Sequence, residues 1–201
     1  MLAIPVWGYE KHPHWFRDLV SRCIVYFTGY PYTHVGIHFM GNLYESTIWT
    51  DAKGRLRSGI RVTKIGDPDV RPPDFCMVPW RVELTKERMD RIRDALDRHV
   101  DGGRPYNVFK LVVLAVVWPT RWFWKRIRWV PFHHEVFGTV CSTFVDRVMF
   151  EARWDLFPEE WESYTVPGQF VNIAGWRREK CIGSPRGRAL NVSYYLDDIG
   201  D

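Results

Sequence analysis

Helical spacing of apolar residues characterises the segment from residue 12 to residue 29, HPHWFRDLVSRCIVYFTG. Apolar side chains recur there every three or four positions, as on one face of an amphipathic helix, and Gly29 supplies a stop signal. These apolar positions are Trp15, Phe16, Leu19, Val20, Cys23, Ile24 and Phe27. We therefore predict a helix that ends at Gly29.

After this helix the pattern changes to one typical of β-strands. The stretches THVGIHF and NLYESTIW are rich in β-branched and aromatic residues, and Met40 and Gly41 separate them. This arrangement predicts a β-hairpin. Two more strands are predicted at GIRVTKI, residues 59–65, and at DFCMVPW, residues 74–80, which follows a proline-rich break.

The second half of the chain is predicted to be mainly helical. The segment after Thr85 has a threonine cap signal, apolar residues at helical spacing and a glycine stop. Another helix is expected to open at Pro105, in PYNVFKLVVLAVVW. A third is expected to begin at Cys141, and beyond Asp155 we expect irregular structure with short elements only.

Strands followed by helices are the element order of an α+β domain rather than of alternating βαβ units. The 201 residues and the hydrophobic content of 46% are typical of one domain with a substantial core. We predict a single domain over residues 1–201, with a motif-bearing core at about residues 30–155 and an irregular C-terminal extension at about residues 156–201.

The four cysteines are widely scattered and contain no CxxC pair. This distribution argues against a zinc site and against a disulfide scaffold, and it favours a reducing compartment. No secretion signal is predicted at the N-terminus, and the strongest apolar run, residues 111–118, is far shorter than the roughly 20 residues of a membrane-spanning helix. We expect a cytoplasmic or virion-associated protein.

The net charge of +4 hides a local surplus of positive charge in RWFWKRIRW, residues 121–129. Such a segment could bind an anionic polymer or a membrane surface, although a solvated face is the simpler interpretation. The basic and aromatic side chains concerned are Arg121, Trp122, Trp124, Lys125, Arg126 and Arg128. A nucleic-acid partner is not expected, because no nucleic-acid motif accompanies them.

Cys141 stands at the start of a predicted amphipathic helix, in GTVCSTFVDRVMF. Its sulfur would face the unpaired N–H groups of the first helical turn, and the positive end of a helix favours a thiolate, as a nucleophile requires. The alternative is a buried cysteine that only packs as a small apolar side chain. A catalytic cysteine needs a histidine elsewhere in the fold.

Two of the seven histidines, His34 and His38, lie in a predicted strand. Alternation places both on one face, with Gly36 between them open to a close backbone approach. Glu45 is the carboxylate of the next strand, and an acid in an otherwise apolar strand needs a partner. Depending on the turn, either His38 or His34 would lie opposite Glu45, and periodicity does not choose between them.

Four short motifs then occur in an order that points to a family. They are THVGI, LYES, RPYNVF and TVCSTFV, with a weaker echo in YTVPGQF. The set resembles the circularly permuted branch of the NlpC/P60 papain-like cysteine hydrolases, the YiiX and YaeF type, in which the histidine strand precedes the cysteine helix. The resemblance covers about residues 32–150 and implies a papain-like antiparallel sheet packed against a cysteine-bearing helix and further helices.

The resemblance also implies roles for individual residues. Cys141 would be the nucleophile, His34 the base and Glu45 the group that orients the base, which leaves His38 as a neighbour. Tyr106 would line the cleft or contribute to the oxyanion hole, beside the backbone N–H of Cys141. The alternative is a buried tyrosine whose hydroxyl is satisfied within the fold. The residue after Tyr106 is an asparagine where the family usually has an aspartate, so a charge is not required at that position.

The activity implied is hydrolysis of an amide bond through a thioester, with no cofactor and no metal. A cell-wall (peptidoglycan) peptide is the first substrate that we expect. A lipid amide or ester, processed by hydrolysis or acyl transfer at a membrane surface, is the alternative. A catalytically silent binding module of the same fold is a further alternative, against which the intact cysteine, histidine and glutamate argue.

Overall fold

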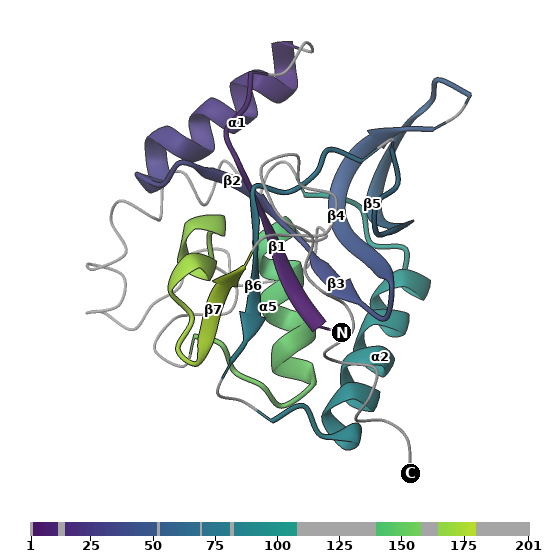
Figure 1. Ribbon diagram of the computed structural model, residues 1–201. Coiled ribbons are helices and arrows are strands. Elements are labelled where there is room, and N and C mark those ends of the chain that lie inside the picture. The colour runs from purple at the N-terminus through teal and green to yellow at the C-terminus, as the bar shows by residue number, and fades with distance from the viewer. Residues whose placement is uncertain are drawn as a thin grey trace, which may run out of the picture.

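The computed structural model of the protein describes residues 2–11, 15–51, 53–68, 70–80, 83–107, 140–157 and 165–179. These residues form an α+β fold in which an antiparallel sheet is accompanied by helices (Figure 1). The α+β class predicted from the order of the elements is confirmed.

The strands are β1 (Leu2–Gly8), β2 (Tyr32–Val35), β3 (Ile37–Phe39), β4 (Asn42–Thr50), β5 (Leu56–Lys64), β6 (Phe75–Pro79) and β7 (Trp176–Glu179). They form one sheet in the order β5-β4-β3-β1-β6-β7, with β2 also paired to β1. The helices are α1 (Trp15–Thr28), α2 (Lys86–Asp101) and α5 (Cys141–Glu151), and η2 (Pro167–Asn172) is a short 3-10 helix.

The three helices with described bounds lie where the sequence pattern predicts them. α1 ends one residue before Gly29, which takes a positive φ of 72°. α2 is capped by Thr85, whose hydroxyl accepts from the backbone N–H of Arg88 at 3.3 Å. α5 begins at Cys141. The helix expected from Pro105 and the basic aromatic segment at residues 121–129 fall largely or wholly outside the described residues.

β1 occupies the centre of the sheet, although the sequence pattern does not predict it. All its residues are buried, so the strand lacks the alternation of a half-exposed strand, and it contains Pro5. The N–H of Gly36 donates to the carbonyl of Pro5 at 3.2 Å, but proline has no N–H to return. The strand is accordingly interrupted at Gly36, which separates β2 from β3.

The main core lies between the sheet and the two helices α2 and α5 (Figure 1). Alternate residues of β1, such as Ile4 and Val6, join Phe144 and Val148 of α5 and Leu96 of α2 in one buried cluster. Each of these side chains is almost completely removed from water, which typically stabilises a fold by about 1.5–3 kcal/mol per large side chain. This packing fixes α5, and with it Cys141, against the sheet.

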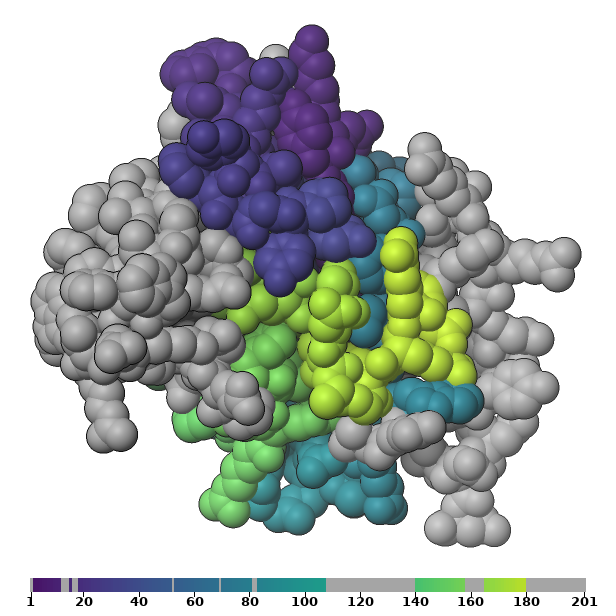
Figure 2. Space-filling view, turned by 90° about the vertical axis from the view of Figure 1, so that its left-hand side faces the viewer, coloured from purple at the N-terminus to yellow at the C-terminus, as the bar shows by residue number. Residues whose placement is uncertain are grey.

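The segment after residue 156 adds to the sheet rather than forming only an extension. β7 pairs antiparallel with β6, from Cys76 opposite Glu179 to Pro79 opposite Trp176. η2 packs beneath the end of α1, where a Cβ on Gly168 would lie 2.0 Å from the ring of Tyr30. Figure 2 shows η2 and β7 in yellow-green directly below the α1–β2 region. The elements are short, as expected, but they are integral to the fold.

The cysteines differ in state. Cys23 and Cys141 are free thiols, whereas Cys76 is disulfide-bonded to a partner outside the described residues. The bond at Cys76 runs against the expected reducing compartment, which the sequence favoured because one bond between cysteines distant in sequence leaves no spacing motif. Within the described ranges, no helix is both long enough and apolar enough to cross a bilayer.

Candidate active site

Cys141 is the first residue of α5, as predicted, and is only 1% exposed. Val140 precedes it in extended conformation, and the side chain of Thr143 bonds back to the Val140 backbone at 3.2–3.3 Å. The sulfur is therefore held at the end of the helix where backbone N–H groups have no acceptor within the helix. This environment favours negative charge.

The YTVPGQF motif lies beside this helix terminus. The hydroxyl of Ser142 donates to the carbonyl of Thr165 at 2.6 Å, and both residues are buried. The turn that follows is closed by Val166, whose N–H donates to the Gln169 side chain at 2.8 Å. The motif thus anchors the N-terminus of α5 next to the cysteine.

His34 on β2 pairs with Glu45 on β4. Nε2 of His34 lies 2.9 Å from Oε1 of Glu45. The glutamate side chain is 8% exposed and the histidine side chain 21% exposed, so water competes little with the contact. The structure therefore selects His34, rather than His38, as the partner of Glu45.

The strand register differs from both predicted possibilities. Phe39 pairs with Asn42 across the two-residue turn of Met40 and Gly41, both of which have positive φ. Continuing this register places Glu45 opposite Gly36, so neither histidine lies directly across from the glutamate. Both alternatives were wrong because the turn has Met40 and Gly41 as its two central residues, with the non-glycine Met40 in the left-handed region.

Gly36 creates the space that the glutamate occupies. A Cβ at this position would lie 2.9 Å from the carbonyl oxygen of Tyr44 and 3.4 Å from Cγ of Glu45. The predicted close approach at Gly36 is confirmed. Because Gly36 has no side chain, the Glu45 carboxylate lies over it and reaches His34 diagonally.

The charge state of His34 depends on its two neighbours. Burial by itself lowers the pKa of the imidazole, but the charge of Cys141 and its hydrogen bond to the ring, together with Glu45, raise this pKa to about 10. Since Glu45 contacts Nε2, the nitrogen left for the sulfur is Nδ1. The structure thus brings together Cys141, His34 and Glu45, which are far apart in sequence.

His38 has the opposite character. Its side chain is 2% exposed, and Nδ1 lies 3.8 Å from Sγ of Cys76. Burial lowers the pKa of His38 to about 4, against the opposing charge of Glu45. A neutral imidazole that packs next to the pair, but does not share its proton, fits the neighbour expected from the resemblance.

The remaining predicted site residues are less closely defined. Tyr106 is half-buried, and its backbone N–H donates to the hydroxyl of Ser58 on β5 at 2.8 Å. This contact does not decide its role at the cleft or oxyanion hole, which stays a prediction. The following residues lie outside the described part of the chain: Arg121, Trp122, Trp124, Lys125, Arg126 and Arg128.

Trp7 on β1 is a site neighbour that the sequence analysis missed. Its indole ring lies 5.0 Å from the imidazole of His34, measured between ring centroids. The only signal in the sequence is the apolar run at residues 2–8, which has neither alternation nor a motif. Across the described ranges, no group of three or more His, Cys, Asp or Glu side chains is arranged to hold a metal ion.

No protein-family model matches this chain, and no curated protein matches it either. The chemistry of the site must therefore be inferred from its geometry.

Proposed function

We propose that this protein is a thiol-dependent hydrolase that cleaves an amide bond, with Cys141 as nucleophile, His34 as acid and base, and Glu45 as the orienting group. The observation that carries the proposal is the contact of His34 with Glu45 at 2.9 Å, on a histidine whose proton is also stabilised by Cys141. We further propose that the fold is the permuted papain-like fold of the NlpC/P60 hydrolases, since a histidine strand precedes a cysteine helix that packs on an antiparallel sheet.

The first half of the proposed reaction forms a thioester. The Cys141 thiolate attacks the carbonyl carbon, and the carbonyl oxygen becomes an oxyanion near the backbone N–H of Cys141. The imidazolium of His34 then gives its proton to the amide nitrogen. The carbon–nitrogen bond breaks, the amine leaves, and neutral His34 remains beside the thioester.

The second half releases the acid. Neutral His34 takes a proton from a water molecule, whose oxygen attacks the thioester carbon. The carbon–sulfur bond breaks, the carboxylic acid leaves, and Cys141 again has its negative charge beside a protonated His34. Throughout both halves, Glu45 accepts from Nε2 and holds the ring so that Nδ1 faces the sulfur.

A cell-wall peptide is the substrate that we propose first, because the resemblance to NlpC/P60 hydrolases implies cleavage of peptide amide bonds. One observation favours the second candidate, a lipid amide or ester hydrolase or acyltransferase at a membrane surface. α1 projects from the body of the molecule (Figure 1) and exposes Trp15 at 73%, Leu19 at 50% and Tyr26 at 82%. Exposed aromatic and aliphatic side chains on one helix are typical of a membrane interface.

The proposal is tested by incubating the protein with muropeptides and, separately, with lipid amides, and then identifying products and any acyl-enzyme by mass spectrometry. We expect products from one class and a mass increase located on Cys141. The Cys141→Ala protein should fold normally by circular dichroism and give no product. An active Cys141→Ala protein would disprove the mechanism.

Thiol reactivity separates the enzyme from the silent module. Cys23 is the internal control, because it is also a free thiol but lies outside the motifs that place a histidine and a glutamate beside Cys141. Near neutral pH, iodoacetamide should alkylate Cys141 much faster than Cys23, since the thiolate is the reactive form. Equal, slow alkylation of both thiols would favour a binding module.

A further inference from the structure

Trp7 is paired with His34 across the two neighbouring strands β1 and β2. The indole is 4% exposed, and its ring plane is tilted by 47° to that of the imidazole at a centroid distance of 5.0 Å. Directly opposed residues of an antiparallel pair have side chains on the same face of the sheet. His34 therefore has an aromatic neighbour in addition to Glu45 and Cys141.

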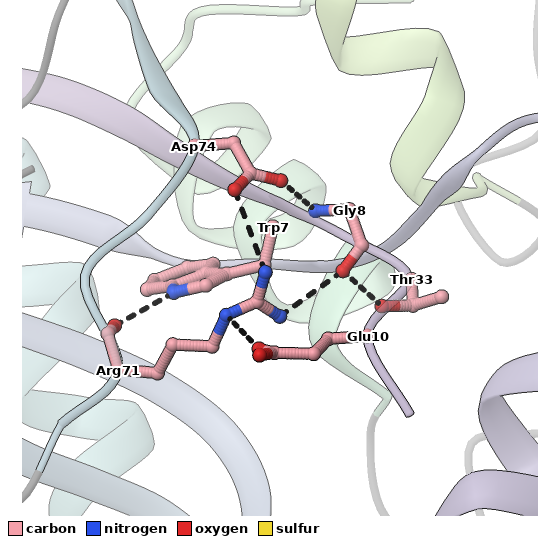
Figure 3. Close-up of polar contacts among 6 residues, drawn as sticks. All are labelled: Trp7, Gly8, Glu10, Thr33, Arg71 and Asp74. Carbon is pink, nitrogen blue, oxygen red and sulfur yellow. Dashed lines mark hydrogen bonds and ion pairs between the residues drawn. The ribbon is translucent and has the colours of Figure 1, made fainter. Parts of the chain in front are cut away.

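The indole is fixed in its orientation. Its Nε1–H donates to the backbone carbonyl of Arg71 at 2.9 Å, so turning the ring would break a hydrogen bond in a partly buried setting. Figure 3 shows the indole nitrogen directed at that carbonyl. The position of Trp7 thus depends on the loop that contains Arg71.

That loop is held to the end of β1 by charged side chains (Figure 3). The guanidinium of Arg71 lies 2.7 Å from Oε2 of Glu10, donates to the carbonyl of Gly8 at 3.2 Å and lies 3.4 Å from Oδ1 of Asp74. The other oxygen of Asp74 accepts from the N–H of Gly8 at 2.7 Å. Both polar groups of the Gly8 backbone are therefore bound by this loop.

The Gly8 carbonyl also accepts a hydrogen bond from Thr33, the residue before His34. The hydroxyl of Thr33 donates to the carbonyl of Gly8 at 3.3 Å. A Cβ at Gly8 would lie 2.6 Å from Oδ2 of Asp74, so a larger residue would push the carboxylate away. The contacts from Arg71 and Asp74 thus extend to the strand segment that presents the imidazole.

We propose that Trp7 is a positioning residue for His34: its indole, held by the Arg71 carbonyl, keeps the imidazole in contact with Glu45 and Cys141 and stabilises its protonated form. The indole face attracts a cation, and this attraction is stronger in a desolvated site than in water. The inference rests on the proposed function, because positioning matters only if His34 carries the reactive proton.

The test measures the titration of His34 by NMR on protein labelled at histidine nitrogens, with His34→Gln to assign the signal. Trp7→Leu, which removes both the ring face and the donor, should lower the titration midpoint of His34 by about one pH unit. Trp7→Phe keeps a ring face and should give a smaller shift in the same direction.

Trp176→Leu is the matched control, since Trp176 is also buried but packs against Trp154. It should lower the melting temperature and leave the His34 titration unchanged. Should Trp7→Leu fail to fold, Arg71→Ala replaces it: this variant keeps the carbonyl, loses the guanidinium contacts and should shift the His34 midpoint downward.

The two proposals fail in different ways. A wild-type protein in which His34 titrates near its usual value, and Cys141 reacts no faster than Cys23, would overturn the proposed function. A wild-type protein with a raised His34 midpoint that is unchanged in folded Trp7→Leu, or in Arg71→Ala, would overturn the role of Trp7 alone.

Discussion

Two histidines of the described structure contact a glutamate through Nε2, one in the candidate site and one between α2 and α5. His34 lies 2.9 Å from Glu45, and His99 lies 3.2 Å from Glu151. Each imidazole also lies beside an aromatic ring, at centroid distances of 5.0 Å for His34 and 5.7 Å for His99. By geometry alone, the two pairs are nearly equivalent.

Their protonation differs because their further neighbours carry different charges. Burial lowers the pKa of His99, and the nearby Arg147 and Arg104 reinforce this effect against the attraction of Glu151. Glu151 is also shared, since it accepts from Arg147 at 2.9 Å and from Arg98 at 3.0 Å. The pKa of His99 is therefore below its usual value.

In the candidate site, burial also lowers the pKa of His34, but the second neighbour is the sulfur of Cys141, and the net effect raises that pKa to about 10. The comparison shows that a glutamate contact does not by itself raise the pKa of a histidine. What distinguishes the candidate site is that the further neighbour of the imidazole is a cysteine sulfur and not a pair of cations. The following predictions test this distinction.

Replacing each histidine by alanine should give the largest difference between the pairs. His34→Ala should reduce hydrolysis by about 10⁴-fold, because the proton donor and acceptor is lost. His99→Ala should keep the wild-type rate and lose about 1–3 kcal/mol of stability, because it removes a buried ring that packs on Phe144 and contacts Glu151. Product formation by mass spectrometry and urea unfolding measure the two effects.

Reversed outcomes would refute this assignment. If His99→Ala were inactive and His34→Ala active, the pair between α2 and α5 would be the chemically competent one. If His38→Ala were inactive while His34→Ala was active, the imidazole paired with Glu45 would not be the base.

Neutralising each glutamate should give an intermediate effect. Glu45→Gln keeps the size of the side chain but removes the charge that orients and stabilises protonated His34, so hydrolysis should fall about 10²-fold without being abolished. Glu151→Gln is the matched control and should leave the rate unchanged while weakening the contacts of α5 with Arg98 and Arg147. Rates measured at saturating substrate distinguish the two variants.

Changes of pH should give the smallest effects, and they should act in opposite directions on the two pairs: raising the pH should affect His34, and lowering it should affect His99. Hydrolysis should decline at alkaline pH with a midpoint of about 10, because His34 must keep its proton to release the amine. The midpoint should fall in Glu45→Gln. A profile that already declines near pH 7 would contradict the proposed charge state of His34.

His99 should make the free energy of unfolding decrease at acidic pH. Because its pKa is lowered in the folded state, the unfolded chain binds more protons as pH falls below about 6.5, and stability is lost there. His99→Gln should reduce this acid loss, as measured by urea unfolding between pH 7 and pH 4. An unchanged acid dependence would show that His99 does not contribute to it.

Much of the candidate site is predictable from local patterns. Apolar spacing identifies the helix that begins at Cys141, and the hairpin pattern brings the segment of His34 close to that of Glu45. The choice of His34 over His38 came from the resemblance and not from periodicity. That choice agrees with the pairing in the structure, whereas the chemical roles stay predictions.

What the sequence did not predict depends on contacts between distant residues. β1 is concealed because Pro5 is typical of edge strands and because a strand buried on both faces lacks alternation. With β1, the neighbour Trp7 is also missed. The register depends on Met40 adopting a positive φ, which is uncommon outside glycine and asparagine. Both features arise from tertiary packing that no short motif encodes.

The central place of β1 has a consequence for biosynthesis. Its partners follow it in the chain, and the pairing of Ile4 with Met77 must wait until more than seventy further residues have left the ribosome. Until β2 and β3 emerge, this apolar strand has no partner, and its edge toward β6 stays unpaired until Met77 follows. We therefore expect the nascent protein to depend on chaperones that bind extended apolar segments.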